Sequence, residues 1–130
     1  MINDHEAVIS LGSNIGGSAG IIRETISRLC EIGEQIVVSE FYQTPDISGS
    51  GVMYLNAVLK GRFALGAEEL QGKCKEMESS LGRLPSGVSK GEVAIDIDVV
   101  IFDGAVVRPV DYGRYYFTIG MDYLKNGRVL

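Results

Sequence analysis

Three stretches of the chain combine apolar, β-branched residues with polar ones in the manner of β-strands. They span residues 6–11, 34–44 and 53–63. Successive side chains of a strand point to opposite faces of a sheet, so each stretch can direct its apolar residues towards a core. In the third stretch, Tyr54 and Asn56 lie on the face opposite the apolar one. This strand therefore offers polar groups away from the core.

A fourth predicted strand, residues 93–102, differs because two carboxylates interrupt its apolar run. Asp96 and Asp98 are one residue apart and so share one face. The opposite face is expected to carry Ile95, Ile97, Val99 and Ile101. Two like charges on a mostly buried strand repel each other and are costly to desolvate unless a cation lies between them. The motif is typical of a Mg²⁺ site completed by substrate phosphates, and the alternative is the solvated face of an edge strand.

Two segments have the spacing of amphipathic helices, in which apolar residues recur every three or four positions. The first spans residues 19–32, with Ser18 as its expected N-cap residue and Gly33 at its end. The second spans residues 67–81 and ends at Gly82. Both segments are therefore predicted to pack one apolar stripe against the sheet.

The order strand, helix, strand, strand, helix, strand predicts an α+β protein with a ferredoxin-like βαββαβ sandwich. This fold has a mainly antiparallel four-stranded sheet with both helices on one face. Asp103 and Gly104 are typical of a hairpin turn, so residues 105–108 are expected to add a C-terminal hairpin extension. In the tail we expect one short helical turn at 121–124, and residues 1–130 form a single domain. The second face of the sheet is then free to form a pocket.

The composition of the 130-residue chain narrows the possible functions. A formal net charge of −5 argues against nucleic acid or an anionic membrane as a partner. The chain has no run long enough to span a membrane and no signal-peptide pattern, so a cytoplasmic location is expected. His5 is the one histidine, which leaves few candidates for general-base chemistry. Cys30 and Cys74 are expected to be buried, reduced thiols, and the sequence specifies no oligomeric state.

Five short motifs occur in order along residues 7–104. They are Ile9-Ser10-Leu11-Gly12-Ser13-Asn14-Ile15-Gly16, Ser39-Glu40-Phe41-Tyr42-Gln43-Thr44-Pro45, Tyr54-Leu55-Asn56-Ala57-Val58, Glu78-Ser79-Ser80-Leu81-Gly82-Arg83 and Ile95-Asp96-Ile97-Asp98. These motifs and the gaps between them resemble the 6-hydroxymethyl-7,8-dihydropterin pyrophosphokinases of folate synthesis. The resemblance favours the metal-binding interpretation of the two aspartates.

Members of this family move the terminal pyrophosphoryl group of ATP onto the pterin hydroxymethyl group and release AMP, using two Mg²⁺ ions. The resemblance implies that the metal ligands are Asp96 and Asp98, with Arg83 also catalytic. It implies a pterin site formed by Thr44, Pro45, Tyr54, Asn56 and Phe117, and a nucleotide site formed by Glu78, Arg83 and Lys90. The expected partners are thus ATP and hydroxymethyl-dihydropterin. Such a transfer needs charge neutralisation more than a strong base, so the scarcity of histidine is no objection.

The same residues also have ordinary structural interpretations. Thr44 and Pro45 are typical of a turn that ends a strand, and Arg83 is typical of a residue that offsets a helix dipole. Tyr54 and Asn56 could equally be a half-buried tyrosine and a solvent-facing asparagine. The family resemblance is what favours the functional interpretation.

The chain departs from the family at phosphate-facing positions. Lys90 and Val93 stand where the family has an aromatic residue and an arginine, and the preceding loop is poor in arginine. Arg108, Arg114 or Lys90 could replace the missing charges. The first hypothesis is therefore an active pyrophosphokinase, and the alternative is a degenerate pterin- or nucleotide-binding relative without transfer activity. A small interaction module with no ligand would leave the coincidence of the motifs unexplained.

Overall fold

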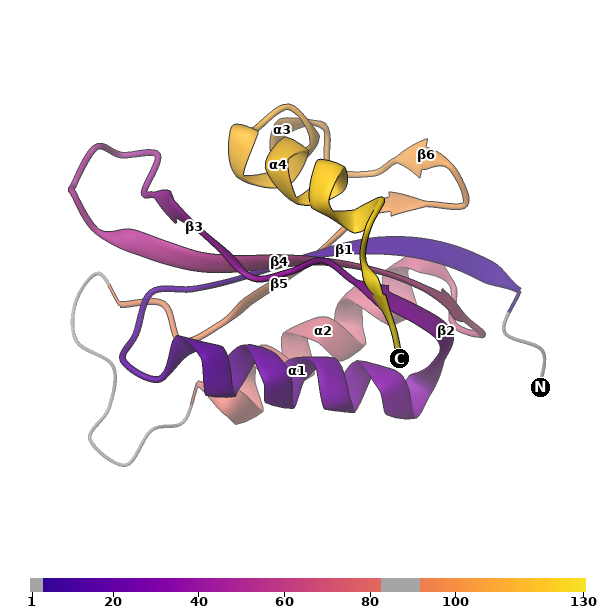
Figure 1. Cartoon of the computed structure of the whole chain (residues 1–130). Helices are drawn as coiled ribbons and strands as arrows, with labels where there is room; N and C mark the ends of the chain where they lie inside the picture. The colour runs from indigo at the N-terminus through magenta and orange to yellow at the C-terminus, as the bar shows by residue number, and fades with distance from the viewer. Residues whose placement is uncertain (1–3, 83–91) are drawn as a thin grey trace.

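The structure is a computed structural model that describes residues 4–82 and 92–130. Its helices are α1 (Ser18–Ile32), α2 (Ala67–Leu81), α3 (Pro109–Tyr112) and α4 (Tyr115–Leu124). Its strands are β1 (His5–Ser13), β2 (Gly33–Val38), β3 (Tyr42–Pro45), β4 (Met53–Phe63), β5 (Asp96–Phe102), β6 (Ala105–Val106) and β7 (Arg128–Val129). Figure 1 shows these strands between two layers of helices.

The described strands pair antiparallel in the order β6-β5-β1-β4-β2-β7, and β3 pairs with β4. The four central strands, together with α1 and α2, keep the βαββαβ order, so the predicted fold class is confirmed. The predicted hairpin is also present as β5 and β6. Asp103 and Gly104 both have positive φ in its turn, as a tight two-residue hairpin turn requires. The C-terminal β7 extends the sheet at its other edge.

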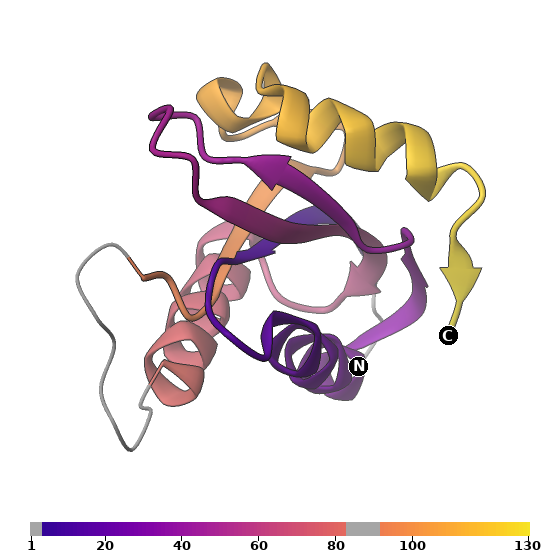
Figure 2. The same ribbon diagram turned by 60° about the vertical axis from the view of Figure 1, so that its left-hand side comes forward.

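Helices α1 and α2 cover one face of the sheet and bury the larger apolar core (Figure 2). The helices contribute Ile22, Ile26, Leu29, Leu70, Cys74 and Met77, which are on the predicted stripes. The sheet contributes alternate residues, among them Ile9, Leu11, Ala57, Leu59, Ile97 and Val99. Cys30 and Cys74 are free thiols, and burial raises the pKa of Cys74 to about 12. No helix in the described part of the chain could span a membrane.

The opposite face of the sheet is not left free, because α4 packs against it (Figure 1). The expectation of a single helical turn in the tail is therefore wrong. Phe117 is 1 % exposed and forms a second apolar cluster with Val8, Val58 and Val100. Gly120 lets the helix approach closely, because a Cβ atom there would overlap Tyr42 and Val58. Among the described residues, α4 therefore covers part of this face, and the part beyond α4 is open to form a site.

A β-bulge at Val100 changes the predicted faces of β5. Val8 pairs with Ile101 and Ile9 pairs with Val99, so β5 has one more residue than β1 at this point. Simple alternation predicted that Ile101 shares a face with Val99. Because of the bulge, Ile101 packs instead against the second cluster on the opposite face. The two aspartates precede the bulge, so their common face is unaffected.

Two local predictions are wrong for identifiable reasons. The predicted strand 34–44 is divided into β2 and β3, because the Ser39 hydroxyl takes the place of a backbone acceptor. The Ser39 hydroxyl oxygen accepts a hydrogen bond from the Val58 N–H at 2.9 Å, while the Ser39 N–H donates to the Val58 carbonyl at 2.9 Å. At the start of α1, the N-cap residue is Gly17, in the left-handed conformation, and not Ser18. The Ser18 hydroxyl donates instead to a preceding backbone carbonyl.

Candidate active site

A cleft of about 360 Å³ opens on the second face of the sheet, next to the start of α4. Its wall contains Ser10, Gly12, Thr44, Pro45, Asp46, Ile47, Tyr54, Asn56, Lys75, Asp96, Asp98, Arg108, Asp111 and Tyr116. The strands β1, β3, β4 and β5 thus supply one wall, and α2, α3 and α4 add side chains around it. The cleft has the size of a small-molecule site.

Thr44, Tyr54 and Asn56 meet in the cleft because β3 and β4 pair with Thr44 opposite Tyr54. The Asn56 side chain is buried, and its Nδ2 atom donates to Thr44 Oγ1 at 2.8 Å and to the Tyr42 carbonyl at 3.3 Å. These bonds fix the orientation of the amide. Burial, and then the negative charge of Asp96, raise the pKa of the Tyr54 phenol, which therefore stays protonated at neutral pH. This side of the cleft, formed by Thr44, Tyr54 and Asn56, is therefore a polar and aromatic wall.

Asp96 and Asp98 lie next to this wall, on the face of β5 that looks into the cleft. Their partners on β1 are Gly12 and Ser10, two residues that also line the cleft. Part of Asp96 reaches solvent, but the surrounding protein atoms, followed by the charges of Asp98 and Glu78, raise its pKa. The charge of Asp98 thus contributes to the raised pKa of Asp96, although the loss of hydration contributes more.

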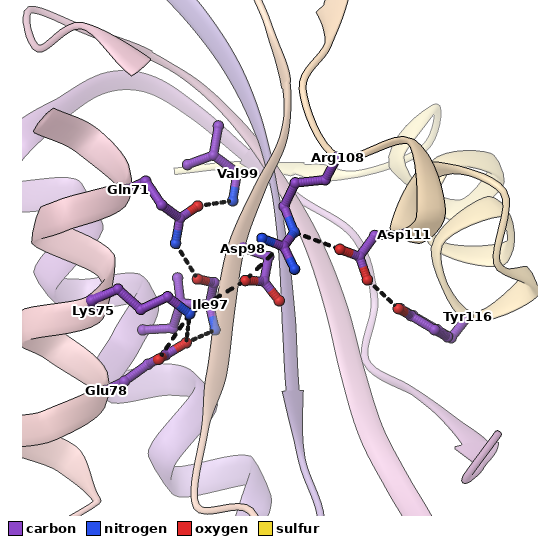
Figure 3. A network of polar contacts seen from close by, with 9 residues as sticks. All are labelled: Gln71, Lys75, Glu78, Ile97, Asp98, Val99, Arg108, Asp111 and Tyr116. Carbon is purple, nitrogen blue, oxygen red and sulfur yellow. Dashed lines mark hydrogen bonds and ion pairs between the residues drawn. The ribbon is translucent and has the colours of Figure 1, made fainter. Parts of the chain in front are cut away.

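Two cationic side chains approach Asp98 from opposite sides (Figure 3). Lys75 Nζ lies 3.5 Å and Arg108 Nε lies 3.7 Å from Asp98 Oδ1. Arg108 Nε also donates to Asp111 Oδ2 at 2.5 Å, and the Tyr116 hydroxyl donates to Asp111 Oδ1 at 2.5 Å. A continuous polar network thus runs from α2 across β5 to α3 and α4.

Gln71 and Glu78 hold the edge of β5 from the α2 side. The Ile97 N–H donates to Glu78 Oε2 at 2.7 Å, the Val99 N–H donates to Gln71 Oε1 at 2.8 Å, and Gln71 Nε2 donates to the Ile97 carbonyl at 3.2 Å. Strand β6 pairs with β5 only further along, at Ile101 and beyond. Side chains of α2 therefore take the place of a strand beside the two aspartates (Figure 3).

The structure brings six predicted site residues into one cleft: Thr44, Pro45, Tyr54, Asn56, Asp96 and Asp98. Glu78 lies beside the cleft, bonded to β5 and to Lys75. Phe117 is in the second apolar cluster, and its neighbour Tyr116 lines the cleft, so the aromatic residue at the cleft is one position before the one predicted. Arg83 and Lys90 lie outside the described residues. Of the candidate replacement cations that the structure describes, Arg108 lines the cleft and Arg114 does not.

Sequence reasoning did not single out Lys75, Asp111 or Tyr116 as residues of the site. A signal existed for Lys75, because Gln71, Lys75 and Glu78 are spaced four and three residues apart and so share one face of a helix. For the residues of the tail, no comparable periodicity was recognised. The structure identifies them through the packing of α3 and α4.

The donor set fits a magnesium ion that substrate phosphates would complete. Among the described residues there is no group of three or more acidic, histidine or cysteine side chains arranged to hold a metal. Mg²⁺ is often bound by only one or two carboxylates, with phosphate oxygens and water completing its octahedron. Asp96 and Asp98 provide two such carboxylates at an open cleft.

Known proteins of folate synthesis are similar to this chain. It is 34% identical over 102 residues to the folate synthesis bifunctional protein, mitochondrial, of Arabidopsis thaliana. The aligned region covers 76% of this chain and 18% of that protein. The chain is 32% identical over 102 residues to the 2-amino-4-hydroxy-6-hydroxymethyldihydropteridine pyrophosphokinase of Aquifex aeolicus, covering 77% of this chain and 62% of that protein. The chain thus spans less than two thirds of the length of either relative.

The sequence model of one protein family also matches most of the chain. The match extends over residues 8–124, which include most of β1, the paired aspartates and all of α4. It therefore contains every described residue of the cleft wall. On this match, the chain belongs to the 7,8-dihydro-6-hydroxymethylpterin-pyrophosphokinase (HPPK) family.

Proposed function

We propose that this protein transfers the pyrophosphoryl group of ATP to 6-hydroxymethyl-7,8-dihydropterin and releases AMP, as a step of folate synthesis. The observation that carries the proposal is that two kinds of surface meet in one cleft. The polar and aromatic wall around Asn56 suits a flat heterocycle, and the Asp96–Asp98 pair suits a metal-bound polyphosphate. Family membership over residues 8–124 supports the same reaction.

The pterin is proposed to bind against β3 and β4. The buried Asn56 amide, fixed by Thr44, would pair with the polar edge of the ring. Tyr54 and Tyr116 present aromatic surfaces on the cleft wall that can pack on its flat faces. The Tyr116 ring is oriented by its hydrogen bond to Asp111, which reduces the ordering cost of binding.

Asp96 and Asp98 are proposed to hold two Mg²⁺ ions together with the phosphates of ATP. Bound there, the ions would neutralise the charge that develops during transfer. The remaining work of the chain is to position the reactants. Lys75 and Arg108 supply positive charge next to the aspartates, and Arg83 and Lys90, outside the described residues, are proposed as nucleotide contacts.

A pterin binder without transfer activity is the second candidate. It is favoured by the charge of the cleft, because its described wall contains two cationic residues against four acidic ones: Lys75, Arg108, Asp46, Asp96, Asp98 and Asp111. A polyphosphate needs more positive charge than this wall provides without metal ions. The two candidates therefore differ in whether bound metal ions supply the positive charge that a polyphosphate needs in this cleft.

The deciding experiment measures AMP formation from ATP, Mg²⁺ and the hydroxymethyl-dihydropterin with the purified protein. We expect AMP release that depends on the pterin and falls by at least about a hundredfold in Asp98→Asn. Asp122→Asn, a change in the exposed part of α4, is the matched control and should keep full activity. Pterin binding followed by fluorescence, in the absence of AMP formation, would instead establish the binder.

A further inference from the structure

Lys75 and Arg108 converge on a single oxygen atom of Asp98. Lys75 Nζ and Arg108 Nε lie 3.5 and 3.7 Å from Oδ1, and they come from α2 and from the segment before α3 (Figure 3). Asp98 is a largely buried carboxylate, with 18% of its side chain exposed. Two positive charges from the chain itself therefore lie next to this oxygen.

Each of the two cations has a second acidic partner besides Asp98. Lys75 Nζ lies 3.1 and 3.2 Å from the two carboxylate oxygens of Glu78. Arg108 is hydrogen-bonded to Asp111, which is in turn held by Tyr116. A cation that leaves Asp98 is thus not left unpaired. Displacement from Asp98 requires only a small movement of a charge that remains anchored.

We propose that Lys75, together with Arg108, is a tethered counter-ion that a divalent cation must displace from Asp98, and that this competition couples metal binding to phosphate binding. The inference rests on the proposed function, because it takes Asp98 as a metal ligand. A free metal ion gains little at Asp98, since it only replaces one positive charge by another. A metal ion that arrives with a polyphosphate also gives the displaced ammonium a new anionic partner. Lys75 therefore disfavours the metal alone and favours the metal–phosphate complex.

The test is a pair of titrations followed by calorimetry, one with Mn²⁺ alone and one with a preformed Mn²⁺–triphosphate complex. For Lys75→Met we expect Mn²⁺ alone to bind roughly three- to tenfold more tightly than to the wild type. The Mn²⁺–triphosphate complex should bind at least about fivefold more weakly. A variant that merely disturbs the cleft would weaken both, so the opposite signs distinguish the coupling from damage to the fold.

Two further variants serve as controls. Lys73→Met removes a lysine of the same helix that pairs with Glu76, and it should change neither titration. Lys75→Arg keeps the charge and should retain the wild-type behaviour. Equal or weaker binding of Mn²⁺ alone to Lys75→Met would overturn the inference.

Asp98→Asn separates failure of the inference from failure of the proposed function. If Asp98→Asn loses Mn²⁺ binding while Lys75→Met behaves as the wild type, the metal site stands and the coupling is wrong. If Asp98→Asn binds Mn²⁺ as the wild type does, the metal site is wrong and the coupling falls with it.

Discussion

The two faces of the sheet are stabilised in different ways. The face under α1 and α2 is covered by one large apolar cluster. The opposite face is shared between a small apolar cluster under α4 and a polar cleft. Strand β4 serves both, since Ala57 and Leu59 point to the first face while Asn56 and Val58 point to the second. The comparison teaches that the first face serves stability, whereas the second face combines a smaller apolar cluster with the candidate site. A change on the first face should therefore affect stability alone, and a change under α4 should affect both.

The largest effect is expected from breaking the first face with Phe63→Ala. Phe63 is fully buried, and Gly33 and Gly61 lie against its ring. Removing the ring should lower the free energy of unfolding by about 3–5 kcal/mol, measured by urea denaturation. Val129→Ala, at an exposed edge position, should change it by less than about 0.5 kcal/mol. A loss below about 1 kcal/mol for Phe63→Ala would contradict the assignment of stability to this face.

Gly120→Ala tests the packing of α4 on the second face of the sheet. The added methyl group would collide with Tyr42 and Val58 and push α4 away from the sheet. We expect a loss of about 1–3 kcal/mol in unfolding free energy, together with weaker pterin binding because Tyr116 moves with the helix. Gly72→Ala, in α2 with no atom near the new methyl group, should instead stabilise the protein by up to about 1 kcal/mol. Unchanged pterin affinity in Gly120→Ala would show that Tyr116 does not contribute to the site.

Gln71→Leu sharpens the comparison, because Gln71 connects a helix of the first face to the strand that carries the aspartates. The change leaves the Val99 N–H and the Ile97 carbonyl without their side-chain partner. We expect a loss of about 1–2 kcal/mol, measured by thermal denaturation, and faster hydrogen exchange at Val99. Gln43→Leu, on the exposed side of β3, is the matched control with little expected effect. Equal stability of the two variants would mean that water replaces the lost bonds.

The smallest effect is expected from Asp96→Asn, which removes one of the two repelling charges. The pKa of Asp96 in the folded protein is raised above its ordinary value of 3.8. At pH values between 3.8 and this raised pKa, the folded protein binds more protons than the unfolded protein. The contribution of this carboxyl group to stability therefore falls as the pH rises through that window, and stays lost above it. Relative to Asp96→Asn, the wild type should lose melting temperature from about pH 3.8 upward. A difference that does not vary with pH would contradict the raised pKa of Asp96.

The element order was predictable because alternation and helical spacing are local properties of the sequence. The bounds of β4 and α2 agree with the pattern of apolar residues. The role of the tail was not predictable in the same way. Helix α4 mixes tyrosines with a glycine whose value lies in a close tertiary contact, and no local pattern indicates such a contact. The bulge at Val100 is likewise visible only from the pairing of β5 with β1.

The site was predictable where its residues lie on strands. Tyr54, Asn56 and the aspartates follow from alternation, once the apolar face is known. Side chains that enter from helices depend on how each helix is rotated against the sheet. Adjacent helical residues differ by about 100° in direction, so placing Phe117 instead of Tyr116 in the cleft is an error of a single position with a large geometric consequence.

The contacts that Gln71 and Glu78 make with β5 also bear on solubility. A β-branched strand with unpaired backbone groups at its edge is a template for a strand of another molecule, and natural proteins protect such edges. Here two polar side chains of α2 occupy those groups between Ile97 and Val99. Helix α2 therefore blocks edge-to-edge pairing at the part of β5 that carries the two aspartates. Without the side chains of Gln71 and Glu78, we expect the protein to self-associate at high concentration before it unfolds.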